Sequence, residues 1–161
     1  MIKHPIRPFY EKNSEILILG SFPSVKSREQ MFFYGHPKNR FWRVVASVYG
    51  CVVPQTIPEK RKFLLENKVA LWDVIGECDI HGSSDTSIKN VIPNDLSVIL
   101  DNANIKRIFV NGKTAEKYFI KYIQDEIGQS AVCLPSTSPA NAAWSQERLA
   151  EEWKQIRMRD I

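Results

Sequence analysis

The sequence predicts an α/β protein, a three-layer α/β/α sandwich around a central, mostly parallel four-stranded sheet. Four short apolar runs, each closed by glycine or proline, are typical of strands buried on both faces. Segments with helical apolar spacing separate these runs, and this alternation favours right-handed βαβ units. The four runs are Glu15–Gly20, Val69–Ile75, Arg107–Gly112 and Ala131–Pro135.

The first two helices are expected between the first and second strands. Apolar residues recur from 41 to 49 at the spacing of one helical face. Asn39 precedes this stripe as a candidate N-cap, and Gly50 follows it as a stop signal. A second helix is predicted from Thr56 to about residue 67, because Thr56 opens a sequence with capping-box spacing.

Two further helices are predicted in the second half of the chain. An apolar stripe runs from 115 to 127 and is stopped by Gly128. The C-terminal stripe at 149–156 has Ser145, followed by acidic residues, near its start. Between the second and third strands, the sequence predicts a long polar connection from 76 to about 95.

Composition limits the class of protein. The chain has 161 residues, 43% of them hydrophobic, so we expect one domain spanning residues 1–161 with a full core. Three cysteines without a C-x-x-C pair cannot assemble a disulfide framework or a four-thiolate iron–sulfur site. The sequence contains no apolar run long enough for a signal peptide or a membrane span, which predicts a cytoplasmic protein without a membrane partner. We expect a monomer, and the formal charge of +4 permits an anionic partner.

Motifs that would suggest a cofactor are incomplete. Asn111–Thr114 contains the end of a phosphate-binding loop, but Arg107 stands where the first glycine of that loop is required. The histidines His4, His36 and His81 show no metal-ligand spacing. We therefore expect neither a metal nor an organic cofactor.

Aromatic and basic side chains concentrate between residues 22 and 42. Six aromatic residues lie in this segment. The stretch from Lys26 to Arg43 contains five basic residues and one acidic residue. Aromatic rings beside cations suit a site that stacks a nucleobase and holds a phosphate backbone. The alternative is that rings such as Phe41 and Trp42 belong to the core face of a helix.

Three blocks of sequence carry a family resemblance. They read Ile-Leu-Gly-Ser-Phe-Pro-Ser at 18–24, Phe-Tyr-Gly-His-Pro-Lys-Asn-Arg-Phe-Trp at 33–42, and Leu-Pro-Ser-Thr-Ser-Pro-Ala-Asn at 134–141. These blocks resemble signature segments of the uracil-DNA glycosylase superfamily, and more narrowly those of its hypoxanthine-DNA (deoxyinosine) glycosylase branch. The resemblance covers most of the chain and implies one α/β domain that flips a base out of DNA.

The first block, by this resemblance, lines the pocket for the base. The residues concerned are Gly20, Ser21, Phe22, Pro23 and Ser24. Mismatch-specific relatives carry at its third position an Asn that positions a water. Phe22 stands there in this chain, and a phenyl ring cannot orient or polarise a water.

The resemblance to the hypoxanthine branch assigns catalysis to the Asn of the second block, which is Asn39. Its amide oxygen would accept a hydrogen bond from a water and aim that water at the anomeric carbon. Capping of the following helix is the alternative role of Asn39. Tyr34 corresponds to the aromatic residue that stacks on the extruded base, with a packing role as the alternative.

Two more base-binding residues are expected at strand ends. Asn111 resembles the position from which the superfamily reads the base edge, and an amide can pair with O6 and N1–H of hypoxanthine. A turn role before Gly112 is the alternative. Asp73 ends the second strand and is expected either to orient the base or a polar group, or to cap the following segment.

The third block resembles the loop that presses against the DNA strand. The DNA-binding residues expected from the second and third blocks are Lys38, Arg40, Ser136, Thr137, Ser138, Pro139, Ala140 and Asn141. Relatives begin this block with a His or Asn that stabilises the departing base, and some carry a bulky wedge. Ser136 and Ala140 with Asn141 replace these groups here, which favours lesions that are already poorly paired, such as hypoxanthine.

The whole sequence predicts a monofunctional DNA glycosylase that acts on DNA containing deaminated bases, preferentially hypoxanthine. Water would hydrolyse the N-glycosidic bond. Lys38 is the only lysine in the three blocks, so we expect no Schiff-base lyase step. Two alternatives stay open: a uracil- or mismatch-specific glycosylase, and a non-catalytic nucleic-acid binding module that keeps the pocket.

Overall fold

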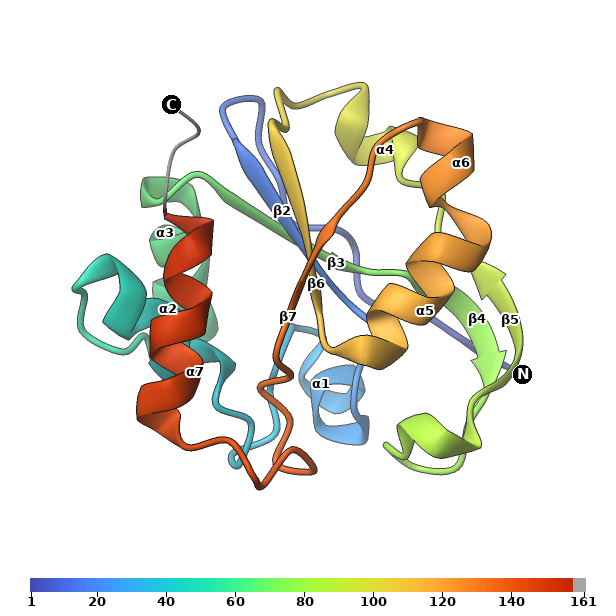
Figure 1. Ribbon diagram of the computed structural model, residues 1–161, viewed down its shortest axis with the longest axis horizontal. Helices are drawn as coiled ribbons and strands as arrows, with labels where there is room; N and C mark the ends of the chain where they lie inside the picture. Colours follow the sequence, from blue (N-terminus) through green and yellow to red (C-terminus); the bar gives the residue numbers. More distant parts are fainter. Residues whose placement is uncertain (158–161) are drawn as a thin grey trace.

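The computed structural model describes residues 1–157 (Figure 1). Residues 158–161 of the expected domain lie outside this part. The strands are β1 (Ile2–Lys3), β2 (Ile16–Gly20), β3 (Val69–Asp73), β4 (Ile75–Asp79), β5 (Lys89–Pro93), β6 (Arg107–Asn111) and β7 (Val132–Leu134). The α-helices are α1 (Val25–Gln30), α2 (Phe41–Tyr49), α3 (Ile57–Glu66), α4 (Ser97–Leu100), α5 (Lys113–Tyr122), α6 (Gln124–Ile127) and α7 (Gln146–Trp153). Two short 3₁₀ helices are η1 (Asp85–Ser87) and η2 (Lys154–Ile156).

The four predicted strands form one parallel sheet in the order β3-β2-β6-β7. Every residue of β2 and β3 is buried, as expected of strands covered on both faces. Helices α2, α3 and α7 lie on one side of this sheet, and α4, α5 and α6 lie on the other (Figure 1). The predicted three-layer α/β/α architecture is therefore confirmed.

Predicted helix signals are mostly confirmed in the structure. Gly50 and Gly128 end α2 and α6 with a left-handed backbone, a conformation that favours glycine. Thr56 forms the complete capping box of α3, and Ser145 caps α7 through its side chain. The stripe expected as one helix at 115–127 is interrupted at Ile123 and forms α5 and α6.

The prediction of a long polar connection from 76 to about 95 was wrong. Strands β4 and β5 lie there and form a small antiparallel sheet with β1, in the order β1-β4-β5. The ladder between β4 and β5 is irregular, and most residues of β5 are exposed, so no regular apolar alternation marks these strands. The run predicted as one strand at 69–75 accordingly divides after Asp73 between the two sheets.

Helix α1 also gave no periodic signal, because Ser27 is its only buried residue. Ser24 nevertheless caps it by accepting a hydrogen bond from the Ser27 amide. This helix sits beside the ends of the central strands (Figure 1), so its cap residue borders the pocket described below.

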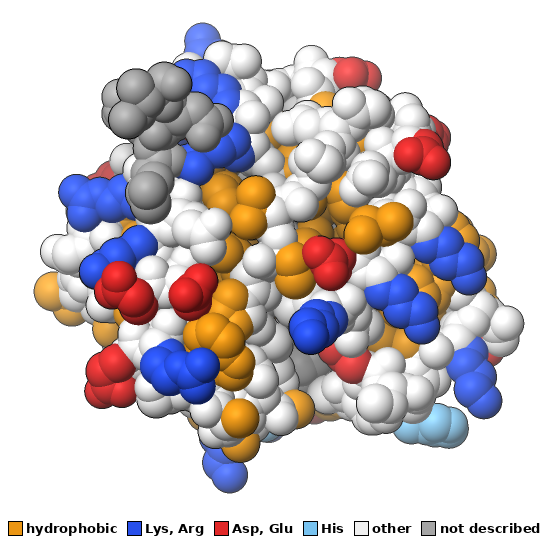
Figure 2. Space-filling view, in the orientation of Figure 1, with side chains coloured by type: hydrophobic (Ala, Val, Ile, Leu, Met, Phe, Trp, Pro, Cys, Tyr) orange, Lys and Arg blue, Asp and Glu red, His pale blue; other side chains and the backbone are white. Residues whose placement is uncertain are grey.

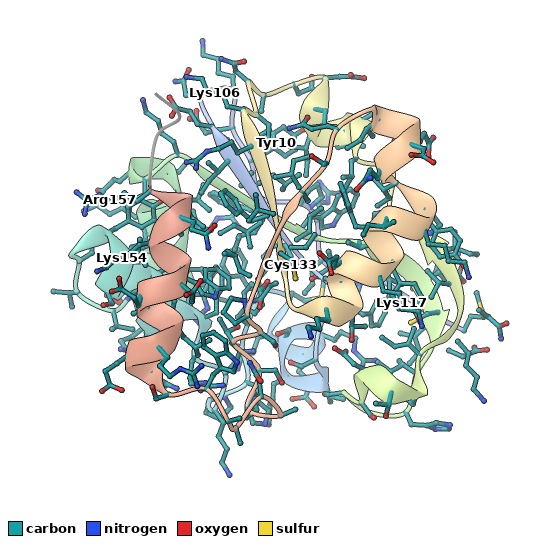
Figure 3. All side chains as sticks on the ribbon, viewed as in Figure 1. Tyr10, Lys106, Lys117, Cys133, Lys154 and Arg157 are labelled. Atoms are coloured by element: carbon teal, nitrogen blue, oxygen red, sulfur yellow. The ribbon has the colours of Figure 1, made fainter. Side chains whose placement is uncertain are left out.

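Charged side chains on the face shown in Figure 2 are interspersed, with Lys and Arg beside Asp and Glu. Lys117 lies on α5 and Lys154 begins η2 directly after α7, whereas Cys133 lies on β7 in the interior of the view (Figure 3). In the described part of the chain, no helix has the length and apolar composition needed to cross a membrane.

Candidate active site

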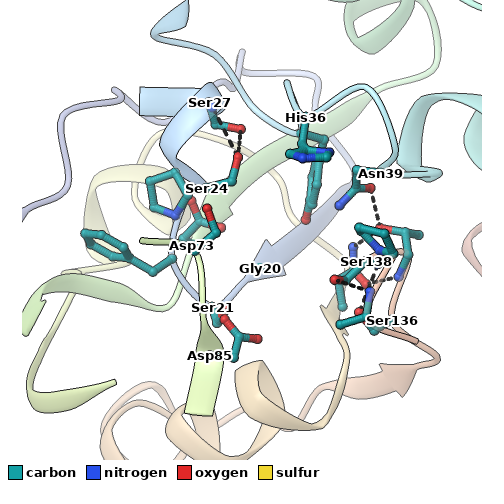
Figure 4. Close-up of a pocket in the computed structure, with 18 of the residues that line it drawn as sticks. Gly20, Ser21, Ser24, Ser27, His36, Asn39, Asp73, Asp85, Ser136 and Ser138 are labelled. Atoms are coloured by element: carbon teal, nitrogen blue, oxygen red, sulfur yellow. Dashed lines mark hydrogen bonds between the residues drawn. The ribbon is translucent and has the colours of Figure 1, made fainter. Parts of the chain in front are cut away.

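A pocket of about 420 Å³ opens where β2, β3 and β6 end. In parallel sheets, ligands bind beyond the carboxyl ends of the strands, and this volume is typical of small-molecule sites. The predicted residues that line it are Gly20, Ser21, Phe22, Pro23, Ser24, Tyr34, Asn39, Asp73, Asn111, Ser136, Thr137, Ser138, Pro139 and Ala140. The fold thus gathers all three sequence blocks around one cavity (Figure 4).

The aromatic segment is mainly core. Phe22, Phe32, Phe33, Phe41 and Trp42 are all buried, which confirms the core alternative for the helix residues Phe41 and Trp42. Phe22 and Phe33 still contribute to the pocket wall. Tyr34 is the aromatic residue of this segment that remains partly exposed in the pocket, so base stacking by this segment depends on its ring.

Tyr34 has an unusual local structure. Its φ of 53° places it in the left-handed region, which is uncommon for a residue with a side chain. One face of its ring stacks on Phe41 at a centroid distance of 4.0 Å. Its hydroxyl is buried and has no hydrogen-bond partner among the described residues. Burial, together with the nearby charge of Asp73, raises the pKa of this hydroxyl, so it remains protonated.

Asp73 lies on the pocket floor and is held by His4. The His4 Nε2 lies 2.7 Å from Asp73 Oδ2, and both side chains are almost fully buried. The Ile6 amide donates a hydrogen bond to His4 Nδ1, so the His4 proton resides on Nε2 and is donated to Asp73. The second carboxylate oxygen, Oδ1, receives no hydrogen bond from any residue in the described range. This carboxylate therefore does not cap the following segment.

Gly20 is required for this arrangement. A Cβ at position 20 would lie 2.4 Å from Asp73 Oδ1 and 3.1 Å from the Tyr34 hydroxyl oxygen. The missing side chain lets the carboxylate reach across the end of β2 into the pocket.

Two hydrogen bonds to its side-chain oxygen hold the Asn39 amide in place. Asn39 Oδ1 accepts hydrogen bonds from the Phe41 amide and from the Thr137 hydroxyl, each at 2.9 Å. The oxygen therefore already has two donors, so both of its lone pairs are used before a water could donate to it as predicted. The capping function is present, although α2 begins one residue later than expected, after Arg40. The amide nitrogen is turned toward the cavity in Figure 4 and has no partner among the described residues.

Asn111 is largely occupied by Thr137. Its Oδ1 accepts from the Thr137 amide at 3.1 Å, and its Nδ2 donates to the Thr137 hydroxyl at 3.0 Å. Thr137 is fully buried and thus ties the end of β6 to Asn39. The structure therefore favours a positioning role for Asn111 over the predicted reading of the base edge.

Three predicted DNA-binding residues do not line the pocket. Lys38 is exposed to solvent. The Arg40 guanidinium donates to the carbonyls of Ser138, Asn141 and Trp144, so it clamps the third block instead of standing free for phosphate. Asn141 donates to the Ser136 carbonyl and closes the same loop.

Asp85 is the most informative residue that sequence reasoning missed. It lies in η1, within the segment 83–86 that forms one wall of the pocket. Its Oδ1 accepts a hydrogen bond of 3.2 Å from Ser21 Oγ in the first block. Although the residue is exposed overall, partial removal of the carboxylate from water raises its pKa, and the charge of Asp73 adds to this effect. Other missed pocket residues are Ser27, Phe33, His36, Ser83, Ser84 and Thr86.

Within residues 1–157, no group of three or more His, Cys, Asp or Glu side chains could hold a metal ion. The polar groups of the pocket are carboxylates, amides, hydroxyls and the imidazole of His36. Such a set can bind a planar heterocycle by hydrogen bonds and can accept a proton from water.

Comparisons with known proteins identify the family of this chain. A family model described as the uracil DNA glycosylase superfamily matches residues 7–160. Two curated relatives named hypoxanthine DNA glycosylase come from Methanosarcina acetivorans and Methanosarcina barkeri. The first is 35% identical over 158 residues, covering 97% of this chain and 98% of that protein. The second is 37% identical over 143 residues, covering 88% and 89%.

A solved structure is also similar. It is a solution NMR structure of a Methanosarcina acetivorans protein provisionally described as a uracil DNA glycosylase, with a TM-score of 0.81 and 34% sequence identity. The similarity covers 97% of this chain and 96% of that one. Because the family match spans almost the whole chain and every segment that lines the pocket, the chain belongs to the uracil DNA glycosylase superfamily.

Proposed function

We propose that this protein is a DNA repair glycosylase that excises hypoxanthine from DNA by hydrolysing its N-glycosidic bond. The observation that carries the proposal is the near full-length similarity to two relatives named hypoxanthine DNA glycosylase. The pocket supports it, because a volume of about 420 Å³ lined by aromatic rings and by many polar side chains suits one extruded nucleotide. Its lining contains no lysine, which supports a monofunctional enzyme without a Schiff base.

The reaction requires a nucleophile and a leaving group on opposite sides of the anomeric carbon. We assign the water side to Asp85, whose carboxylate stands next to the first block, where Phe22 cannot serve. The water oxygen bonds to C1′ as the C1′–N9 bond breaks, and the bonding electron pair leaves with the purine. The water proton passes to Asp85 and then to solvent, and the purine takes up a proton from solvent.

Asn39 is assigned to the leaving-group side. Its Nδ2 is free to donate a hydrogen bond to a ring nitrogen or the keto oxygen of the departing purine, where negative charge develops. The buried network with Thr137 and Phe41 keeps this amide from turning, because an exchange of oxygen and nitrogen would face the Phe41 N–H with another donor. The two assigned side chains lie on different walls of the cavity in Figure 4.

Lys38 and Arg40 are expected to respond differently to substitution. Lys38→Gln removes an exposed cation beside the pocket, so it lowers affinity for any DNA duplex and reduces the slope of log K against log salt by about 1. Arg40→Gln removes three charge-assisted bonds to carbonyls and lowers the free energy of unfolding by about 2 kcal/mol. Fluorescence anisotropy at several salt concentrations and urea unfolding measure the two effects. Equal effects of both variants on unfolding would contradict this division of roles.

The proposed function is tested with duplexes carrying one inosine, uracil or xanthine. The duplexes are incubated with the protein and then cleaved with alkali, which breaks the strand only at abasic sites. We expect cleavage at inosine, and none before alkali treatment. Cleavage confined to uracil would support a uracil-specific glycosylase instead. Absence of cleavage with all three lesions, with retained DNA binding, would support a non-catalytic binding module.

A further inference from the structure

The floor of the pocket presents a hydrogen-bond acceptor of fixed polarity. Asp73 is almost fully buried, and one of its oxygens is committed to His4 while the other faces the cavity. Because His4 Nδ1 accepts from the Ile6 amide, His4 can only donate to Asp73. The pair leaves Oδ1 as an acceptor, with no donor competing for it among the described residues.

Deamination changes the polarity of a base edge in a way that such an acceptor can detect. Adenine carries a lone pair at N1, whereas hypoxanthine carries an N1–H and a keto group at C6. A carboxylate oxygen accepts a hydrogen bond from N1–H but faces the adenine N1 lone pair with another lone pair. In a buried site, an unmatched polar contact loses binding, since neither group can turn to water.

We propose that Asp73 Oδ1 accepts the ring N–H of the flipped base and thereby selects hypoxanthine over adenine, with His4 holding the carboxylate in place. This inference rests on the proposed function and adds the group that reads the lesion. It replaces Asn111, whose amide is taken up by Thr137. Gly20 contributes to this selection, because the absence of a Cβ leaves the space through which Asp73 Oδ1 reaches the base.

The acceptor alone does not distinguish hypoxanthine from guanine, which also carries an N1–H. Extruding a guanine that is paired with cytosine costs more free energy than extruding a mispaired base. Guanine is therefore selected against before it reaches the pocket. The contact with Asp73 therefore defines a class of ligand, namely bases with a protonated ring nitrogen beside a keto group.

The substitution Asp73→Asn tests this proposal, because His4 determines which way the new amide must turn. His4 still donates its Nε2–H, so the new amide must turn its oxygen toward His4 and its NH₂ group toward the pocket. The pocket then offers a donor where it offered an acceptor, while the bond to His4 is kept. We expect the variant to fold and to reverse its preference between the two bases.

The experiment is a chemical-shift titration of ¹⁵N-labelled protein with free hypoxanthine, adenine and 1-methylhypoxanthine. We expect the full-length wild type to bind hypoxanthine at least about 10-fold more tightly than either other base. Asp73→Asn should bind adenine more tightly than hypoxanthine. Asp101→Asn, the same change at an exposed position, should keep the wild-type order. Thermal unfolding by circular dichroism checks that both variants are folded.

Two outcomes would overturn the inference: equal binding of hypoxanthine and 1-methylhypoxanthine by the wild type, or an unchanged preference in a folded Asp73→Asn variant. The comparison with 1-methylhypoxanthine needs no variant, so it remains decisive if Asp73→Asn fails to fold. Binding of free bases is measured without catalysis. Loss of base selectivity in a protein that excises inosine would overturn the inference alone, whereas absence of excision would overturn the proposed function.

Discussion

Replacement of Asp85 by Asn is expected to slow excision of hypoxanthine by about 100-fold or more, the usual contribution of a proton acceptor. The new side chain keeps an oxygen for the Ser21 hydroxyl, so the wall of the pocket should stay in place. What it loses is the basic carboxylate that takes the proton from water. Single-turnover kinetics on an inosine-containing duplex measure the chemical step directly.

The pH dependence supplies a second readout for Asp85. Only the ionised carboxylate accepts a proton, so the wild-type rate should fall on acidification through the pKa of Asp85, which is raised above the usual aspartate range. This acid limb should disappear in Asp85→Asn. His36→Gln serves as a control, because His36 also lines the pocket but has no assigned proton-transfer role. A wild-type rate and acid limb in Asp85→Asn would exclude the carboxylate as proton acceptor.

Replacement of Asn39 by Asp should lower the excision rate by about 100-fold with little effect on folding. The carboxylate retains both hydrogen bonds that the amide oxygen accepts, from Phe41 and Thr137, so the cap of α2 is preserved. The substitution removes the Nδ2 donor that we place against the departing purine. In other enzymes, loss of one donor to a developing negative charge lowers the rate by about 10²- to 10³-fold. Single-turnover rates and urea unfolding, measured on the same preparations, separate the two roles.

The comparison with Asn39→Ala completes this test. The alanine variant loses the donor and the cap together, so it should be as slow as Asn39→Asp and also less stable by about 1 kcal/mol. If Asn39→Asp kept the wild-type rate while Asn39→Ala lost stability, Asn39 would be a helix cap and its catalytic assignment would be wrong.

The sheet and the pocket blocks were predictable because they depend on local sequence. The run from Ile16 to Gly20 is continuously apolar, as burial between two helical layers requires, and the glycine marks its end. Parallel strands bring their carboxyl ends together, so residues such as Asp73 and Asn111 could be placed at one edge without knowledge of contacts.

The hydrogen bonds that decide each role could not be predicted, because they join distant segments. His4 lies 69 residues from Asp73, and Asp85 lies 64 residues from Ser21. An aspartate in a polar segment and a histidine near the N-terminus have no local pattern that links them to these partners. Arg40 illustrates the same difficulty, since its basic character suggested phosphate binding, whereas its contacts are with carbonyls about 100 residues further along the chain.

The close approach at Gly20 has a consequence for how this pocket can vary in sequence. A methyl group at position 20 would overlap the Asp73 carboxylate, which His4 prevents from moving away. Alanine at this position should therefore be tolerated only when the residue at 73 is shorter, and the protein would then lack its acceptor. Positions 20 and 73 are thus coupled, so a relative that departs from glycine at the first should also depart from aspartate at the second, and should differ in the base it selects.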